Sequence, residues 1–178
     1  MTDDIDIKTN WLDPSTLTAV RGQMPIVYVD AVPVRVDDMG QITHVGMLLR
    51  QAPDGSISRT VVSGRVLFGE LIREALVRHL EKDLGPLALP RIPPDPSPFT
   101  VVEYFPDPDK TGFHDPRQHA VSLAFVVPVS GDCHPTQEAL DLGWFTPDQA
   151  TSEHMRKEMT GGHDRLVRMA LASVGRLP

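Results

Sequence analysis

Short runs of apolar residues, separated by turn-forming residues, divide the first third of the chain into strands. β-Branched residues dominate 26–36 and 42–49, and the stretch between them, 37–40, has the composition of a turn. A second turn at 53–55 leads into the looser alternation of 56–62. The pattern therefore predicts a strand pair followed by a third strand.

The apolar period changes to that of a helix between residues 71 and 84. Leu76 and Leu80 fall on one face when residues are spaced at about 100°, and Gly85 followed by Pro86 ends the helix. These positions predict one amphipathic helix. Another of its faces groups four residues, namely Ala75, His79, Lys82 and Asp83.

The second half of the chain combines a proline-rich connector with two strands and a final helix. Residues 86–98 contain six prolines, which predict an extended loop. Residues 99–104 and 120–129 are predicted strands, the second buried on both faces because its apolar run is nearly continuous. Residues 163–174 form an amphipathic pattern that Gly175 closes, which predicts the last helix.

The order of these elements indicates the fold class. Asp13 as N-cap, Pro14 in the first turn, and Gly22 after one or two helical turns at 15–20 predict a short capped helix before the first strand. Strands, a helix, more strands and a last helix indicate an α/β (α+β) fold with a mixed β-sheet sandwiched between helices. We expect residues 1–25 to be a lead-in with the short helix, and residues 26–178 to form a single domain.

Charge and cysteine content narrow the classes of partner. The 17 Lys and Arg residues against 24 Asp and Glu residues give a net charge of −7, so the chain has no summed positive field for nucleic acid. The lone Cys133 cannot form an internal disulfide and fits a cytoplasmic location. The acidic N-terminus and the lack of a long apolar run predict no membrane association.

The segment from residue 64 to 85 carries a spaced set of glycines and charged residues. Five positions stand at the spacing of the Nudix box, Gly-x5-Glu-x7-Arg-Glu-aliphatic-x-Glu-Glu-x-Gly-aliphatic: Gly64, Glu70, Arg78, Leu80 and Gly85. The segment therefore resembles the Nudix box of the Nudix hydrolases, and the resemblance implies the Nudix fold. It also implies that Glu70 and Arg78 form a structural ion pair, and that Gly64 and Gly85 are turn and cap residues.

The chain departs from the family pattern at the metal-binding positions. His79, Lys82 and Asp83 stand where the family has three glutamates. In the family pattern, carboxylates on one helix face hold the divalent cations that neutralise a pyrophosphate before water attacks it. A protonated lysine cannot be a ligand, and imidazole suits softer metals than Mg²⁺. The box is therefore strong support for the fold and weak support for catalysis.

Two segments outside the box extend the resemblance. Residues 115–117, Asp-Pro-Arg, look like an element of the branch that contains ADP-ribose pyrophosphatases, and 142–148 look like the Trp-Phe segment before the last Nudix helices. Arg117 is then a candidate for binding a phosphate through its planar fork, with a loop-anchoring ion pair as the alternative. Five residues of the types that bind zinc also occur in the second half of the chain, namely His114, Asp115, His119, Cys133 and His134. Their spacing matches no structural zinc pattern, so a zinc site is only a minor alternative.

Two functions follow from the resemblance. The first is a Nudix-type hydrolase that cleaves a pyrophosphate bond in a nucleoside diphosphate-linked compound, with Mg²⁺ or Mn²⁺ and an atypical metal site. Asp83 and His79 are then the catalytic and metal-binding residues, and Lys82 and Arg117 bind substrate. The alternative is a catalytically inactive, metal-free module that binds a nucleotide-like small molecule or a protein, with the Lys82 ammonium as phosphate counter-ion. The resemblance makes a homodimer plausible in either case.

Overall fold

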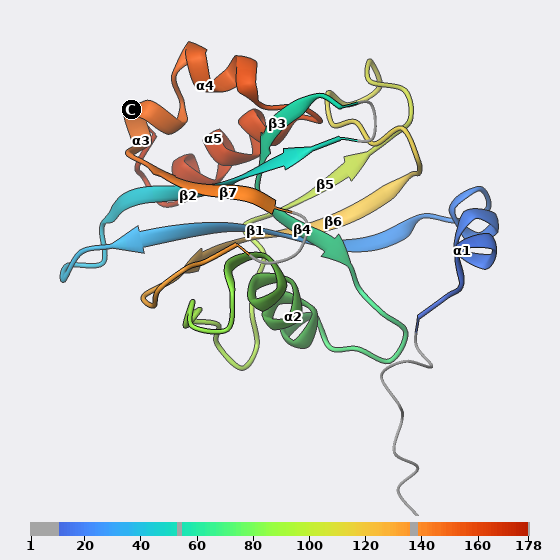
Figure 1. The fold of residues 1–178 in the computed structure, drawn as a ribbon, viewed down its shortest axis with the longest axis horizontal. Coiled ribbons are helices and arrows are strands. Elements are labelled where there is room, and N and C mark those ends of the chain that lie inside the picture. The colour runs from blue at the N-terminus through green and yellow to red at the C-terminus, as the bar shows by residue number, and fades with distance from the viewer. Residues whose placement is uncertain (1–10, 53–54, 136–138, 178) are drawn as a thin grey trace, which may run out of the picture.

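A seven-stranded mixed sheet lies between helices in the computed structural model, which describes residues 11–52, 55–135 and 139–177 (Figure 1). The strands are β1 (Ile26–Val36), β2 (Ile42–Gln51), β3 (Ile57–Thr60), β4 (Val62–Arg65), β5 (Thr100–Tyr104), β6 (Ala120–Pro128) and β7 (Ala139–Phe145). The helices are α1 (Pro14–Arg21), α2 (Ile72–Leu84), α3 (Pro147–Ala150), α4 (Glu153–Glu158) and α5 (His163–Ser173).

Strand β1 is the centre of the sheet. The main strand order is β3-β2-β1-β6-β5, while β4 also pairs with β1 and β7 also pairs with β2. The β1–β6 pair is parallel, from Ile26 opposite Ala120 to Val34 opposite Pro128, and the other pairs are antiparallel. A central strand has both faces covered, which explains the nearly continuous apolar sequence of β1. The predicted mixed sheet between helices is confirmed.

Each face of the sheet packs against its own helices. On one face, Val29 and Ala31 contact the apolar side of α2, including Leu76 and Leu80. On the other face, Val32 and Val34 belong to a cluster that α5 completes. Because side chains alternate along β1, one strand supplies both hydrophobic layers. Figure 1 shows α2 on one side of the sheet and α3, α4 and α5 on the other.

Two features of the sheet differ from the sequence prediction. The predicted strand 56–62 is interrupted at Val61, so that β3 pairs with β2 and β4 continues to Arg65 and pairs with β1. No strand was predicted at the Trp-Phe segment, but residues 142–145 are the end of strand β7, in which Trp144 lies opposite Gly46. An added Cβ at Gly46 would approach the Trp144 ring to 3.0 Å, so the glycine leaves room for the ring against β2.

The connector at 86–98 packs along the α2 side of the sheet. Ala88 is fully buried, the Arg91 N–H donates to the carbonyl of Pro128 at 2.8 Å, and Pro90 forms an isolated bridge with Val129. The loop therefore closes the hydrophobic layer beside β6. No helix in the described part of the chain has the length and apolar character needed to cross a membrane.

Candidate functional site

The loop between β4 and α2 is fixed by a partly buried ion pair from the box. Arg78 donates from Nε to Glu70 Oε1 at 2.6 Å and from Nη2 to Oε2 at 2.8 Å, and Nη2 also donates to the Arg65 carbonyl at 2.9 Å. The Leu67 N–H donates to Glu70 Oε2. Burial acts to raise the pKa of Glu70, but these hydrogen bonds outweigh it and lower the pKa. The pair therefore holds the loop, as the resemblance implies.

His79 occupies the first metal position of the family pattern and packs against the box glycine. An added Cβ at Gly64 would lie 1.8 Å from His79 Cε1, so the ring fills the space beside the glycine. His79 Nε2 lies 3.0 Å from the Arg65 carbonyl oxygen. Because a carbonyl only accepts, Nε2 is the donor. Burial lowers the pKa of His79, which favours the neutral ring.

Asp83 occupies the last metal position and pairs with an arginine from β2. Its Oδ2 lies 2.6 Å from Arg50 Nη2, and the exposed fractions of the two side chains are 2% and 22%. The carboxylate is therefore buried beneath the guanidinium. Arg50 lies at the wall of a pocket, whereas Asp83 is not among the residues that line it.

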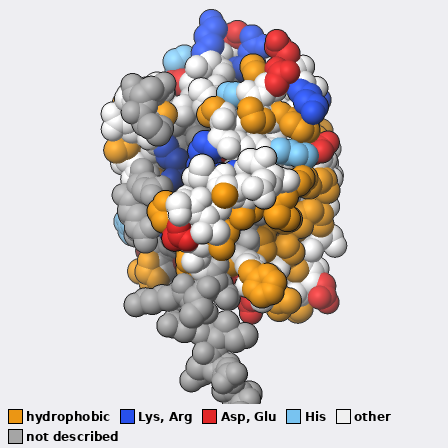
Figure 2. All heavy atoms as spheres, turned by 90° about the vertical axis from the view of Figure 1, so that its right-hand side faces the viewer, with side chains coloured by type: hydrophobic (Ala, Val, Ile, Leu, Met, Phe, Trp, Pro, Cys, Tyr) orange, Lys and Arg blue, Asp and Glu red, His pale blue; other side chains and the backbone are white. Residues whose placement is uncertain are grey.

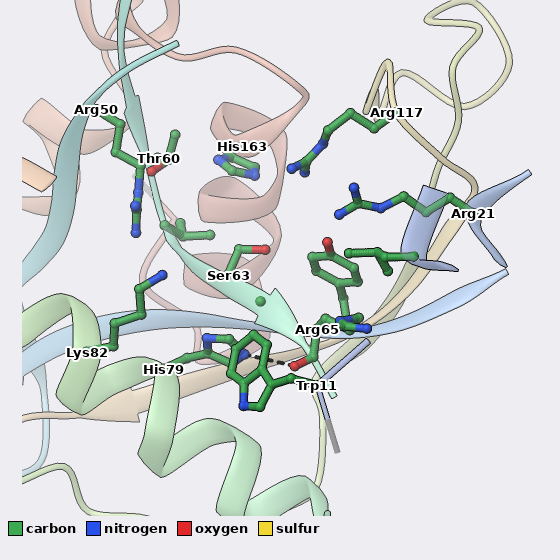
Figure 3. Close-up of a pocket in the computed structure, with 14 residues that line it drawn as sticks. Trp11, Arg21, Arg50, Thr60, Ser63, Arg65, His79, Lys82, Arg117 and His163 are labelled. Carbon is green, nitrogen blue, oxygen red and sulfur yellow. Dashed lines mark hydrogen bonds between the residues drawn. The ribbon is translucent and has the colours of Figure 1, made fainter. Parts of the chain in front are cut away.

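This pocket has a volume of about 420 Å³ and an unusually basic wall. Five cationic side chains line it, and none of its described lining residues is Asp or Glu. The cations are Arg21, Arg50, Arg65, Lys82 and Arg117. Figure 3 shows Arg50 and Lys82 on one side of the pocket, and Arg21, Arg65 and Arg117 on the other. Figure 2 shows basic side chains recessed in the face of the molecule that carries α1.

Arg117 both anchors its loop and lines the pocket. It donates from Nε to Asp115 Oδ1 at 2.9 Å and from Nη2 to Oδ2 at 2.8 Å. Its side chain is still 58% exposed. The hydrogen bonds to Asp115 raise the pKa of Arg117, so its charge is permanent. The loop-anchoring ion pair between Arg117 and Asp115 is therefore observed. It leaves the Arg117 guanidinium at the pocket wall.

A second, more apolar pocket of about 360 Å³ adjoins the basic one. Tyr28, Ser63, Arg117 and His163 line both. Burial lowers the pKa of His163, and its Nδ1 has no hydrogen-bond partner among the described residues. A charged pocket and a more apolar pocket therefore lie side by side and share part of their walls.

The residues at the three altered box positions do not suit a magnesium ion. Mg²⁺ requires an octahedral set of oxygen ligands. His79 offers a ring whose Nε2 is bonded to a carbonyl, Lys82 offers an ammonium, and Asp83 is bound by Arg50. Residues 11–52, 55–135 and 139–177 contain no group of three or more His, Cys, Asp or Glu side chains that could hold a metal ion. The residues considered for a zinc site therefore do not come together as a metal site in this part of the chain.

Three of the residues that the sequence singled out, His79, Lys82 and Arg117, line this pocket, but several of their neighbours were not predicted. These neighbours come from four different elements and from the segment before α1; they are Trp11, Arg21, Arg50, Arg65 and His163. No motif joins them, because only the folded sheet brings these segments together.

The sheet, the box helix and the Glu70–Arg78 pair define a protein of the Nudix superfamily, as the sequence predicted. Within it, the chain belongs to the family described as "Domain of unknown function (DUF4916)", whose model matches residues 7–176. No curated protein matches this chain significantly.

Solved structures agree with this assignment. A structure from Jonesia denitrificans, described as a possible asymmetric diadenosine tetraphosphate hydrolase, is 58% identical, with a TM-score of 0.85 over 88% of this chain and 98% of that one. The Nudix domain of Shewanella oneidensis NrtR, solved with ADP ribose, is 17% identical, with a TM-score of 0.60 over 94% and 96%. A MutT Nudix hydrolase from Burkholderia pseudomallei is 19% identical, with a TM-score of 0.58 over 83% and 98%. The last two likenesses concern the fold alone.

Proposed function

We propose that this chain binds a phosphate-containing, nucleotide-like small molecule, and that its own cationic side chains neutralise the phosphate. The carrying observation is the basic pocket, with five cationic side chains and no Asp or Glu among its described lining residues. Arg and Lys donate charge-assisted hydrogen bonds to phosphate oxygens, which are stronger than bonds between neutral groups. In this proposal Lys82 and Arg117 bind the phosphate of the ligand, which is the role that the sequence predicted for them toward a substrate.

The adjoining pocket supports a ligand with two unlike halves. A chain of net charge −7 concentrates these cations in one hollow, which favours a small anion over a long polyanion. The apolar half beside Tyr104 and Ala120 can accept the less charged part of the molecule, such as a nucleoside. We propose a small-molecule ligand on this ground.

Hydrolysis of a dinucleoside polyphosphate is the second candidate function. It is favoured by the 58% identical structure from Jonesia denitrificans, which is described as a possible asymmetric diadenosine tetraphosphate hydrolase. In this candidate Asp83 and His79 hold Mg²⁺ or Mn²⁺ and act in catalysis. The Asp83–Arg50 pair and the His79–Arg65 hydrogen bond oppose that assignment, and therefore metal-free binding is our first proposal.

Calorimetric titration with diadenosine tetraphosphate, ADP-ribose and tripolyphosphate, in EDTA and in MgCl₂, tests the binding proposal. We expect binding in EDTA, and a loss of roughly tenfold or more in affinity for Lys82→Glu, because a bond to a charged group is worth about 1.5–3 kcal/mol. Arg73→Glu is the matched control, since Arg73 is exposed on the same helix and does not line the pocket.

Product analysis by mass spectrometry on the same solutions distinguishes the two candidates. Binding without products supports the first candidate. Metal-dependent turnover that Asp83→Asn abolishes would replace it with the hydrolase.

A further inference from the structure

Helix α2 and strand β2 meet at an ion pair where the family pattern has a metal site. Asp83 stands at the last metal position, and Arg50 Nη2 lies 2.6 Å from its Oδ2. Lys82 stands at the preceding metal position and lines the same pocket as Arg50. At the three altered positions, three negative charges give way to one negative charge, one positive charge and an imidazole, and Arg50 adds a second positive charge from β2. This part of the site has a net positive charge before any ion binds.

We propose that the Arg50 guanidinium, held by Asp83, takes the place of the metal ion as the counter-charge for the ligand's phosphate, together with Lys82. Asp83 is then a positioning residue that acts through Arg50. This inference rests on the proposed function and adds to it the residues that make metal unnecessary.

Burial explains why Asp83 is suited to holding an arginine. The side chain of Asp83 is 2% exposed, and a carboxylate buried to this degree is strongly destabilising without an opposite charge. Arg50 supplies that charge from β2, and in return its long side chain is fixed at the pocket wall. A fixed side chain loses less conformational entropy when a ligand binds.

The chemistry of guanidinium suits it to both partners at once. A guanidinium is a planar fork with five N–H donors and is always charged, so it can meet a carboxylate on one edge and a phosphate oxygen on another. Figure 3 shows Arg50 and Lys82 together on one side of the pocket. Arg65 and Arg117 lie across the same space. A phosphate in this space would meet cations on both sides.

Calorimetric titration of the full chain with tripolyphosphate, in EDTA and in MgCl₂, tests the assignment. The central variant is Arg50→Met combined with Asp83→Asn, which removes both partners and leaves no buried lone carboxylate. We expect wild-type affinity to be no higher in MgCl₂ than in EDTA, because Mg²⁺ only complexes the free tripolyphosphate. The paired variant should lose roughly tenfold or more in both. Arg73→Met removes one exposed charge from the same helix and is the matched control.

Circular dichroism establishes that each variant folds. If the paired variant does not, Arg50→Lys keeps both the charge and an ion pair, and we expect a several-fold loss of affinity because the planar fork is gone. Asp83→Asn alone should change tripolyphosphate affinity by the same factor in EDTA as in MgCl₂. An effect of this variant confined to MgCl₂ would make Asp83 a metal ligand and overturn the proposal.

Titration with Mn²⁺ alone, followed by electron paramagnetic resonance, gives an independent readout. We expect the Mn²⁺ signal of Asp83→Asn to equal that of the wild-type chain. Mn²⁺ binding that this variant loses would overturn the assignment. Failure of the wild-type chain to bind tripolyphosphate would refute the proposed function itself. Wild-type binding that the paired variant retains in full would refute only the role of Arg50.

Discussion

The imidazole of His79 lies where a side chain at position 64 would be. An added Cβ at Gly64 would be 1.8 Å from Cε1 and 2.2 Å from both ring nitrogens. The sequence suggested only a turn for this glycine. In the structure, Gly64 lies within β4 and its contact with the ring joins β4 to α2. The two residues are therefore complementary, and neither can be changed without affecting the other.

A double-mutant cycle tests this complementarity. Gly64→Ala should destabilise the fold by about 1–3 kcal/mol, because the His79 ring must move and lose its bond to the Arg65 carbonyl. In the His79→Ala background the same change should cost much less, since the space is then open. Urea unfolding of the four proteins measures both values. Equal costs in the two backgrounds would show that the contact is unimportant.

Ion pairs at the site differ in how visible they are in the sequence. The Glu70–Arg78 pair was predicted because both residues lie at fixed places in one motif. The Arg50–Asp83 pair joins β2 to α2, and nothing in the sequence relates the two residues. Asp83 was therefore predicted as a metal ligand from the motif alone. Tertiary packing determines which charged side chain lies beside a buried carboxylate. A single sequence without an alignment does not show that pairing.

At the level of elements, strong periodicity gave accurate predictions. The helix expected at 71–84 is observed as Ile72–Leu84, and the one expected at 163–174 as His163–Ser173. Strand β7 was not predicted as a strand, because its residues are mostly half-buried or exposed and include Gly143. Its place in the sheet comes from pairing with β2, which is a contact distant in sequence.

Helix α1 is attached to the fold by its polar groups. Asp13 caps it as predicted, and the helix has no buried residue. Arg21 Nε donates to Gln118 Oε1 at 2.8 Å, and Leu17 and Arg21 line the basic pocket. The preceding Trp11 is 52% exposed, and its ring lies 5.5 Å from the Arg78 guanidinium. This element therefore contributes to the site without contributing to the core.

Tryptophan fluorescence tests whether a ligand occupies the space beside α1. Tripolyphosphate should reduce acrylamide quenching of Trp11, because a filled pocket limits access to its ring. The other described tryptophan, Trp144, packs under Arg35 at 4.4 Å and should not respond. A Trp11→Phe variant is the control and should show no ligand-dependent change. A change that persists in this variant would place the bound ligand elsewhere.

On the scale of the whole molecule, stability should depend on a histidine at the junction of the two pockets. Burial lowers the pKa of His163, and neighbouring charges modify this effect. The carboxylates oppose it and the guanidinium adds to it; these groups are Asp30, Asp115, Asp164 and Arg50. Tyr104 also faces the ring, edge-on, at 6.1 Å. The folded protein therefore holds this residue neutral.

The sign of the pH effect follows from that lowered pKa. The ordinary pKa of histidine is 6.5, and below this pH His163 binds a proton in the unfolded chain but stays neutral in the folded protein. The free energy of unfolding therefore decreases as the pH falls. The loss is at most about 1.4 kcal/mol per pH unit, and it ends below the folded-state pKa. Urea unfolding from pH 8 to 5 should show a smaller loss for His163→Phe. Parallel profiles for the two proteins would contradict this prediction.

The parallel pairing of β1 with β6 also determines when this protein can fold during its synthesis. Strand β1 is near the N-terminus, but its parallel neighbour ends at Pro128. Antiparallel pairing of β1 with β2 and β4 is available early, whereas long-range parallel pairing forms slowly because a long chain segment must close. His163, which also lines the basic pocket, comes later still along the chain. A ligand site is therefore among the last features to be completed as the chain leaves the ribosome.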